Sequence, residues 1–335
     1  MNQKTKIFLK FTRRFYNIFY NKIKRLIINN SNSTVSQQKG RTLHYVGQDA
    51  SDLIKNKLLD KQPCMISRIG STELKTIITW LEINRKPKFP LDKSINYILG
   101  NPPFWWDENI KHDMRCSSGF FPVTDSSLEA FSKRMIQDIQ NIDILGSWRK
   151  NEMKLSYLLE NVSTVRLKDF EPYSHSDPWS YALQNQVVLV IHPFEQSIKK
   201  QYNKRQLLFE DERVLPEFEL KTLKAVQSIA GNNPGFKTWF EALDWMCQQI
   251  ASIEFDVAII GAGAYGLPLA SYIKSIGKKA VHLGGGTQIL FGIKGERWDK
   301  NPRFQKLYNQ SWVRPLPSET PNNSESVDRG YFSYW

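Results

Sequence analysis

Three glycine-containing turns place polar side chains directly after apolar, strand-like segments of the sequence. They are "SRIGSTEL" at 67–74, "GAGAYG" at 261–266 and "HLGGGTQ" at 282–288. Glycine lets the backbone pass close to a ligand, and the free N–H groups at the start of a following helix attract anions. The chemistry that this pattern predicts is recognition of a phosphate or diphosphate at one edge of a sheet.

The second turn matches the dinucleotide fingerprint through Gly261, Gly263 and Gly266, with Tyr265 inside it. The strand that follows, at 280–283, ends without the Asp or Glu that would bind a ribose hydroxyl. We therefore expect a turn that binds a phosphate or a nucleotide sugar, and neither NAD nor FAD as a cofactor. Two alternatives stay open: a close-packing turn without a ligand, and an oxidoreductase that uses the fingerprint.

The third turn is followed by a stretch rich in hydrogen-bond donors. Gly284 and Gly285 allow close backbone approach, and Gln288, Lys294 and Arg297 can donate to diphosphate oxygens. An arginine can donate to two such oxygens at once. The alternative is a flexible connection with solvated charges.

His192, in "VLVIHPF", falls at another strand end, where open α/β sheets place their sites. The alternative for His192 is a buried histidine whose hydrogen bonds are satisfied within the fold. The other histidines show no metal-ligand spacing, and the sequence has no evident signature of a serine or cysteine nucleophile.

The elements that must position these residues alternate between strand and helix. Continuous apolar runs such as 187–191 and 257–260 are typical of strands buried on both faces. Helical periodicity at 126–141 and 237–252 indicates covering layers. We therefore predict an α/β fold with a Rossmann-like, mainly parallel sheet and helices on both faces.

Three regions follow from composition. Residues 1–40 form a basic amphipathic helix and a polar linker at 29–40, residues 41–300 the α/β domain, and residues 301–335 an irregular tail. In the tail, 314–330 contains three prolines among small polar residues.

The N-terminal helix, at 4–28, separates an apolar face from a basic face. The apolar face contains Phe8, Phe11, Phe15, Ile18, Phe19, Ile23 and Leu26, and the opposite face contains Lys10, Arg13, Arg14, Asn17, Asn21 and Lys24, with Lys22 as the exception. Basic residues interrupt every apolar run, so this helix is expected to lie on an anionic membrane surface without crossing it. The alternative is a helix that packs on the body of the protein or on a partner.

The charge is uneven along the chain. The formal charge is +13, but residues 1–50 carry ten Lys or Arg and one acid, which leaves +4 for the rest. A nucleic-acid groove is therefore not expected in the body. Three widely spaced cysteines, Cys64, Cys116 and Cys247, fit a reducing compartment, and we expect a cytoplasmic protein, peripheral on the inner face of the plasma membrane.

"SRIGSTEL" resembles the R-[FI]-G-D-G-E-L segment of the GT-D-fold glycosyltransferases and their GT-D-like relatives. "SSGFFPVTDSSLEAF", "IDILGSW", "VVLVIHPF" and the stretch at 255–298 extend the resemblance over about residues 45–300. It implies a nucleotide-sugar donor, a glycan or lipid-linked acceptor in bacterial surface polysaccharide or glycoconjugate synthesis, and a divalent cation, Mn²⁺ or Mg²⁺, held by an Asp-x-Glu pair.

Carried onto this chain, Arg68, Gly70 and Glu73 match the motif, while Ser71 takes the Asp position and Thr72 the middle Gly. One carboxylate holds Mg²⁺ less firmly than two. Either other groups neutralise the diphosphate, or other ligands replace the Asp.

Glycosyl transfer needs charge stabilisation on the leaving diphosphate and, for inversion, a base near the acceptor hydroxyl. Glu73 is a candidate base or single metal ligand, with Asp113 as a second candidate base. Glu73 also has a structural interpretation: with Gly70 as N-cap it stands at the third helical position, where a carboxylate favours the helix dipole. A non-catalytic donor-binding or scaffold protein of a glycan assembly complex is the alternative function that the missing Asp supports.

Overall fold

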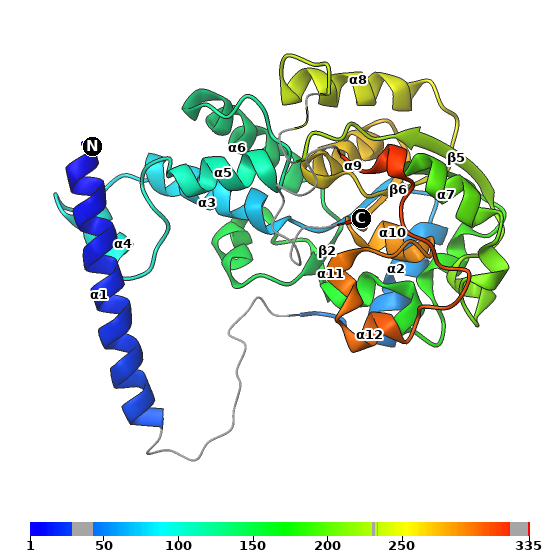
Figure 1. The fold of residues 1–335 in the computed structure, drawn as a ribbon, viewed down its shortest axis with the longest axis horizontal. Coiled ribbons are helices and arrows are strands. Elements are labelled where there is room, and N and C mark those ends of the chain that lie inside the picture. The colour runs from blue at the N-terminus through cyan, green and yellow to red at the C-terminus, as the bar shows by residue number, and fades with distance from the viewer. Residues whose placement is uncertain (29–42, 230–231, 233, 322–333) are drawn as a thin grey trace.

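The computed structural model describes residues 1–28, 43–229, 232, 234–321 and 334–335 (Figure 1). The predicted linker at 29–40 and the later part of the predicted irregular stretch at 314–330 lie outside the described residues.

A parallel sheet of seven strands, in the order β3-β2-β1-β7-β6-β4-β5, forms the centre of the described chain. The strands are β1 (Cys64–Ser67), β2 (Ile144–Ser147), β3 (Ser163–Arg166), β4 (Val187–His192), β5 (Glu219–Lys224), β6 (Val257–Ile260) and β7 (Lys279–His282). The predicted Rossmann-like α/β fold is confirmed. The predicted runs at 187–191 and 257–260 correspond to β4 and β6.

Alternation along the strands builds two separate cores. In β4, Leu189 and Ile191 belong to the core on one face of the sheet, whereas Val188 and Val190 belong to the core on the other face. The same alternation holds in β6. A strand buried on both faces needs apolar residues at consecutive positions, which is why these segments are continuous apolar runs.

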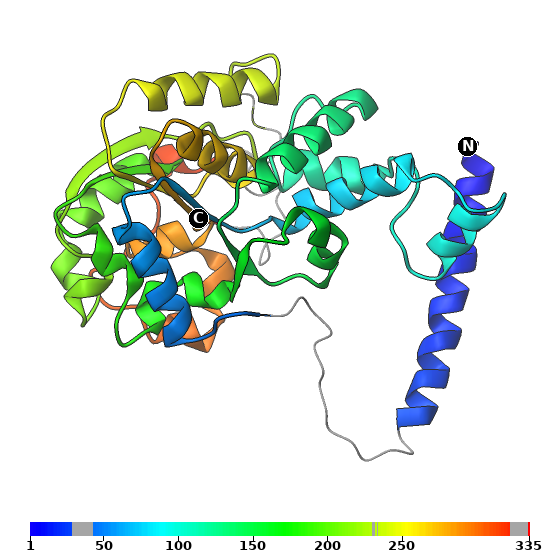
Figure 2. The ribbon, with the colours of Figure 1, turned by 180° about the vertical axis from the view of Figure 1, so that it is seen from behind.

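Helices cover both faces (Figures 1 and 2). One core is closed by α3 (Ser71–Asn84), α5 (Glu108–Cys116), α6 (Asp125–Ile139), α8 (Trp239–Ala251) and α9 (Gly266–Ser275). The other is closed mainly by α2 (Gln48–Leu59), α7 (Glu195–Tyr202), α10 (Gly286–Leu290), α11 (Glu296–Asp299) and α12 (Pro302–Gln305). The helical periodicity at 126–141 and 237–252 thus corresponds to α6 and α8.

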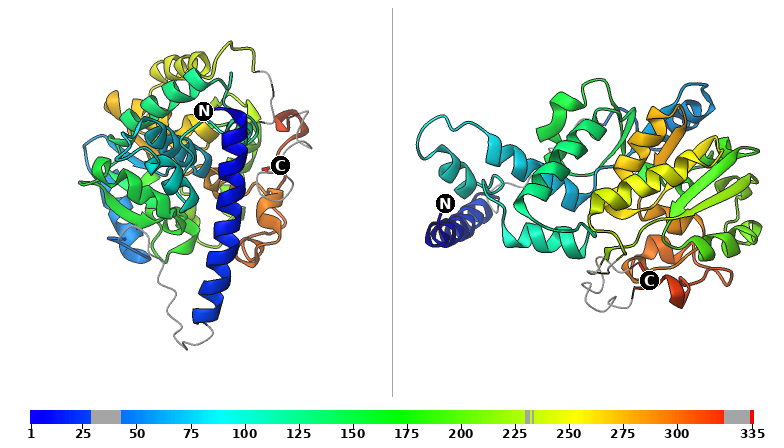
Figure 3. Two further views of the ribbon diagram at one scale, coloured as in Figure 1. Left: turned by 90° about the vertical axis from the view of Figure 1, so that its left-hand side faces the viewer. Right: turned by 90° about the horizontal axis from the view of Figure 1, so that it is seen from above.

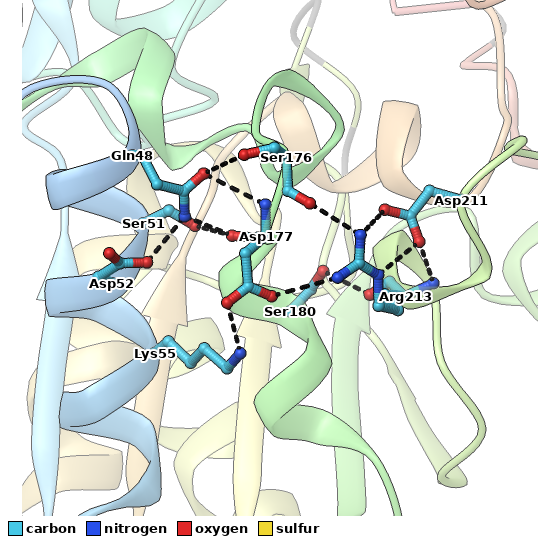
Figure 4. A network of polar contacts seen from close by, with 9 residues as sticks. All are labelled: Gln48, Ser51, Asp52, Lys55, Ser176, Asp177, Ser180, Asp211 and Arg213. Carbon is cyan, nitrogen blue, oxygen red and sulfur yellow. Dashed lines mark hydrogen bonds and ion pairs between the residues drawn. The ribbon is translucent and has the colours of Figure 1, made fainter.

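A polar network centred on Asp177 fastens α2 to the segment that follows β3 (Figure 4). The backbone carbonyl of Asp177 accepts hydrogen bonds from Gln48 Nε2 and Ser51 Oγ, both at 2.8 Å. Its carboxylate pairs with Lys55 Nζ at 2.8 Å and with Arg213 Nη1 at 3.6 Å. The network ties α2, which precedes β1, to the segments at 176–180 and 211–213.

The described part of the tail returns to the body instead of extending from it. Residues 317–319 form a short 3₁₀ turn, and Glu319 is buried. Its Oε1 accepts hydrogen bonds from the backbone N–H groups of Gln196 and Ser197 at the start of α7, at 2.7 Å and 3.2 Å. A carboxylate at this position satisfies N–H groups that the helix itself leaves unpaired.

The N-terminal helix is α1 (Gln3–Ile28), which packs beside α4 (Asp92–Ile98) at the end of the molecule away from β5 (Figure 3). Leu9 is buried against Tyr97 and Trp105. Lys10 pairs with Asp107 at 2.5 Å, and Arg13 donates to the carbonyl oxygens of residues 100 and 101. The contact with the body therefore uses the polar face of α1.

The predicted apolar face of α1 points away from the body. Over its described positions, Phe8, Phe11, Phe15, Ile18 and Phe19 are between 52% and 66% exposed. Among the described residues, no helix is both long enough and apolar enough to cross a bilayer.

Close packing between α9 and β7 depends on Gly266. A Cβ built on Gly266 overlaps the ring of His282, whose Cδ2 lies 2.5 Å from that position. Gly266→Ala should therefore lower the free energy of unfolding by about 1–3 kcal/mol, because the buried imidazole has no room to move. Urea denaturation followed by tryptophan fluorescence measures the change.

Gly286→Ala is the matched control for this prediction. The nearest atom to a Cβ on Gly286 is Leu283 Cβ at 3.9 Å, an ordinary contact. Equal stability of the two variants would contradict the packing role of Gly266.

Candidate functional site

One cavity of about 200 Å³ lies at the carboxyl ends of all seven strands. Each strand or the loop after it contributes to the wall: Arg68 after β1, Trp148 after β2, Leu167 after β3, His192 from β4, Gln227 after β5, Gly261 after β6 and Gly284 after β7. Along the sheet the chain passes outward from β4 to β5 but in the opposite direction from the adjacent strand β6 to β7, and such a reversal marks the crevice where open α/β sheets bind ligands.

The cavity brings together most of the residues singled out in the sequence. Those that line it are Arg68, Gly70, Ser71, Thr72, Glu73, His192, Gly261, Gly263, Gly284, Gly285 and Arg297. All three glycine-containing turns therefore meet at one site.

At the end of β1, the chain turns at Gly70 into α3. Gly70 is the N-cap, and the carboxylate of Glu73 folds back over it, filling the space that a Cβ would occupy. Glu73 Oε1 accepts a hydrogen bond from Ser118 Oγ at 2.7 Å. Glu73 thus stands in the first turn of α3 and also lines the cavity. Its role at the helix N-terminus and its position in the candidate site are therefore compatible. The first N–H groups of α3 have no partners inside the helix and open toward the same space.

Arg68 is the central cation of the cavity. Its Nη1 lies 2.8 Å from the position of a Cβ on Gly284, and its guanidinium lies 5.0 Å from the ring centroid of Trp148. Burial lowers the pKa of Arg68, while Tyr334 and Glu73 oppose that shift. An arginine keeps its charge in proteins even so. Its Nε is buried and has no hydrogen-bond partner among the described residues.

Arginine side chains are prominent around the cavity. Arg297 lines it and stacks on Tyr334 at 4.8 Å, while Arg149 stacks on Trp148 at 3.8 Å at the rim. Within the described ranges, neither these two arginines nor Arg68 forms an ion pair. Glu73 is the single carboxylate side chain among the described lining residues. Arginines without an ion-pair partner favour an anionic ligand.

Two neutral histidines complete the polar lining. Burial lowers the pKa of His192 to about 3, and burial followed by the charge of Arg68 lowers that of His282 to about 3. His192 Nδ1 accepts a hydrogen bond from the backbone N–H of Phe194 at 2.9 Å. The proton of the neutral ring is therefore on Nε2, which makes this nitrogen a donor.

The second turn supports the site mainly through its shape. A side chain at Gly261 would collide with His192 and Thr287, because a Cβ built there lies 2.8 Å from Thr287 Cβ. Gly263 has a φ of +53°, and a Cβ built on it would face open space, with its nearest neighbour 4.0 Å away. The close-packing interpretation of this turn therefore fits Gly261, whereas the ligand-binding interpretation fits the open backbone at Gly263.

Five predicted site residues lie outside the cavity lining. Asp113 pairs with Lys75 at 2.8 Å on the surface, and Lys294 lies over the ring of Tyr308. Gly266 packs on His282, as described above. Tyr265 is buried in a stack with Trp239, where burial raises its pKa.

Gln288, the last of the five, has its amide nitrogen occupied. Its Nε2 donates to the backbone carbonyls of residues 293, 294 and 334. Gln288 therefore orders the loop and the returning chain end, and its donors are not available to a ligand.

Sequence reasoning missed several residues of the site, among them Trp148, Ser118, His282, Tyr334 and Trp335. Trp148 and Ser118 fall inside segments that carry the family resemblance, and Trp148 directly follows β2, so a strand-end rule could have found it. Tyr334 and Trp335 lie beyond a long polar stretch, and no local pattern places them at the sheet.

The described residues do not by themselves fit a resident divalent cation. In the described chain, no three His, Cys, Asp or Glu side chains cluster in a way that could hold a metal. Mg²⁺ and Mn²⁺ prefer several oxygen ligands, and Ser71 stands where the resembled motif has a carboxylate.

The sequence matches no family model, and neither a curated protein nor a solved structure matches the chain.

The buried histidines make folding stability sensitive to acid. An unfolded histidine takes up a proton below about pH 6.5, whereas folded His192 does so only near pH 3. The unfolded state binds more protons between these values, so lowering the pH from 7 to 5 should reduce the free energy of unfolding by up to about 2 kcal/mol for this histidine. His192→Gln should remove that part of the loss, as measured by urea denaturation at both pH values.

His112→Gln, at an exposed position on α5, is the matched control and should keep the acid sensitivity of the wild type. Parallel stability curves for wild type and His192→Gln would contradict the buried, neutral state of His192.

Proposed function

We propose that this chain is a glycosyltransferase that moves a sugar from a nucleoside-diphosphate donor to a glycan or lipid-linked acceptor. The observation that carries the proposal is the cavity itself, where unpaired arginines, a helix N-terminus and glycine turns meet at the carboxyl ends of seven parallel strands. The resemblance of "SRIGSTEL" and the later segments to GT-D-like glycosyltransferases supports the same donor class.

The diphosphate would lie between Arg68 and the first turn of α3. Arg68 offers a buried N–H without a partner, and the backbone N–H groups of residues 71–73 add the helix dipole. Arg297 and the Nε2–H of His192 supply further donors from two other walls. Trp148, Tyr334 and Trp335 give flat surfaces on which a nucleobase or sugar can stack.

In the proposed reaction, an acceptor hydroxyl oxygen attacks the anomeric carbon of the donor sugar. The bond from that carbon to the diphosphate oxygen breaks, and the diphosphate leaves with the electron pair. Arg68 and the α3 N-terminus stabilise the charge that develops on the leaving group. Glu73 takes the acceptor proton or orients the hydroxyl, with Ser118 fixing its carboxylate.

A donor-binding protein without turnover is the second candidate. Ser71 in the position of the expected Asp favours it, because one carboxylate must then act alone. Both candidates predict the same anion site and differ only in catalysis.

Substitutions at two residues should separate the effect on donor binding from the effect on turnover. Arg68→Ala should weaken binding of the stabilising nucleotide sugar by at least about tenfold, because a charge-assisted hydrogen-bond donor is lost. Glu73→Gln should keep binding and lower turnover by about a hundredfold or more. Thermal-shift titration with UDP-, GDP-, CMP- and dTDP-sugars, with and without Mn²⁺, measures the first effect, and release of the nucleoside diphosphate measures the second.

Arg115→Ala and Asp113→Asn are matched controls, because both side chains lie on α5 outside the cavity lining. Stabilisation by NAD and by none of the nucleotide sugars would contradict the transferase proposal and favour an oxidoreductase. Unchanged turnover in Glu73→Gln would remove Glu73 from the reaction.

We further propose that α1 holds the protein on the anionic inner face of a bacterial plasma membrane. The body binds the polar face of α1 through Leu9, Lys10 and Arg13, so the phenylalanine face stays free for lipid. An amphipathic helix with aromatic and basic residues binds anionic bilayers by burying the first and attracting the headgroups with the second.

Co-sedimentation with phosphatidylcholine–phosphatidylglycerol vesicles tests this placement in the full-length chain. Phe11→Glu/Phe15→Glu should lose at least about tenfold more affinity than Asn17→Glu/Asn21→Glu, because both pairs add equal charge but only the first removes apolar burial. Equal losses in the two double variants would show that charge alone attracts the protein to the vesicles.

A further inference from the structure

A second hollow, of about 830 Å³, separates α1 from the body beside the catalytic cavity. Its walls come from α1, α3, η1 (Lys150–Leu158) and the stretch at 97–110, which includes the end of α4 and the start of α5. The side chains that carry the argument are Lys10, Arg13, Lys75, Thr79, Lys150 and Lys154. We call this hollow the α1 groove.

The α1 groove has an excess of positive charge. Five of its lining side chains are cationic, and Asp107 is its single carboxylate among the described residues. Asp107 pairs with Lys10, and Asp113, outside the lining, pairs with Lys75.

Three cations of the α1 groove have no carboxylate partner within the described chain. Arg13 donates to two backbone carbonyls, and Lys154 Nζ donates to Asn101 Oδ1 at 2.9 Å. Lys150 has no hydrogen-bond or ion-pair partner among the described side chains. Burial lowers the pKa of Lys154, which means that its charge is partly removed from water. Lys150 and Lys154 are exposed, so their ammonium groups can reach an anionic ligand in the groove.

A polar atom without a partner lies in the same lining. Thr79 is fully buried, and its hydroxyl has no hydrogen-bond partner among the described residues. Because this hydroxyl has almost no accessible surface, Thr79 contributes to the wall of the groove and not to the donors that a ligand can reach.

The α1 groove and the catalytic cavity share two elements. Glu73 at the start of α3 lines the cavity, while Lys75 and Thr79 line the groove. At 1.5 Å per residue, Thr79 is only about 9 Å along the helix from Glu73. On the other side, Trp148 lines the cavity and Lys150 the groove. The groove and the cavity are therefore neighbours along α3 and along the chain at 148–150.

We infer that the α1 groove binds the phosphate or diphosphate head of a lipid-linked acceptor and presents its attached sugar to the catalytic cavity. The anion binding follows from the groove itself, whereas its role as an acceptor site rests on the proposed transferase function. The lipid is favoured as the source of the phosphate because α1 forms one wall of the groove with its polar face and exposes its phenylalanines on the opposite face. The bilayer that takes up those phenylalanines also carries the lipid.

Vesicle binding by the full-length chain tests the inference. Phosphatidylcholine vesicles that carry a polyprenyl phosphate are compared with vesicles that carry phosphatidylglycerol at equal surface charge. The wild type should prefer the polyprenyl phosphate, and Lys150→Ala/Lys154→Ala should reduce that preference by at least about tenfold, because two charged donors are lost.

Lys86→Ala/Lys88→Ala is the matched control. It removes the same charge from exposed positions between α3 and α4, outside the groove lining, and should leave the preference unchanged. Equal losses in the two double variants would overturn the inference, because surface charge would then explain the binding. Inorganic diphosphate that binds as tightly as the lipid would overturn the lipid assignment.

Two further readouts keep this test separate from that of the proposed function. Lys150→Ala/Lys154→Ala should retain nucleotide-sugar binding and the wild-type unfolding midpoint. Arg68→Ala, whose side chain lines the catalytic cavity, should retain the preference for polyprenyl phosphate vesicles. Loss of that preference in Arg68→Ala would contradict a separate site in the groove.

Discussion

The guanidinium of Arg68, largely removed from water at the end of β1, sets the composition of the site. Arg68 lies against the backbone at Gly284 and beside the ring of Trp148, so a side chain at 284 would displace it. Its charge also helps to keep His282 neutral, since burial and Arg68 both lower that pKa. With one carboxylate nearby, the charge of Arg68 is left for a ligand. An anion is the ligand that recovers the free energy lost when such a cation is buried.

The sheet and its strand-end turns could be predicted from the sequence because both depend on local patterns. Continuous apolar runs specify buried parallel strands, and glycine after such a run marks a turn at the sheet edge. This logic predicted strand-end positions for Arg68, Glu73, His192 and Gly284, and all four line one cavity. It could not say which way a side chain in a later helix or loop points. Gln288 and Lys294 follow the third turn closely, yet the amide of Gln288 serves backbone carbonyls.

Contacts between distant segments limited the rest. Asp113 lies close along the chain to a segment that resembles the glycosyltransferases. In the structure, however, it lies on α5 and pairs with Lys75 on the surface. Tyr334 reaches the cavity through interactions with Gln288, Arg297 and Trp298, and none of these partners is visible from the residues around it. Aromatic and cationic partners of this kind depend on tertiary packing, whereas a strand or a turn depends mostly on its neighbours in the chain.

The same limit applies to α1, where periodicity identifies two faces but not the one that meets the body. Hydrophobic burial alone would favour docking by the phenylalanine face, since each large apolar side chain gains about 1.5–3 kcal/mol when it leaves water. The structure instead docks the opposite face, where one buried leucine, an ion pair at Asp107 and two hydrogen bonds from Arg13 provide the contact. The phenylalanines stay exposed, so the free energy that their burial would contribute is not gained by this docking. An anionic bilayer surface can do two things at once: its apolar interior covers the phenylalanines, and its headgroups attract the basic residues of α1.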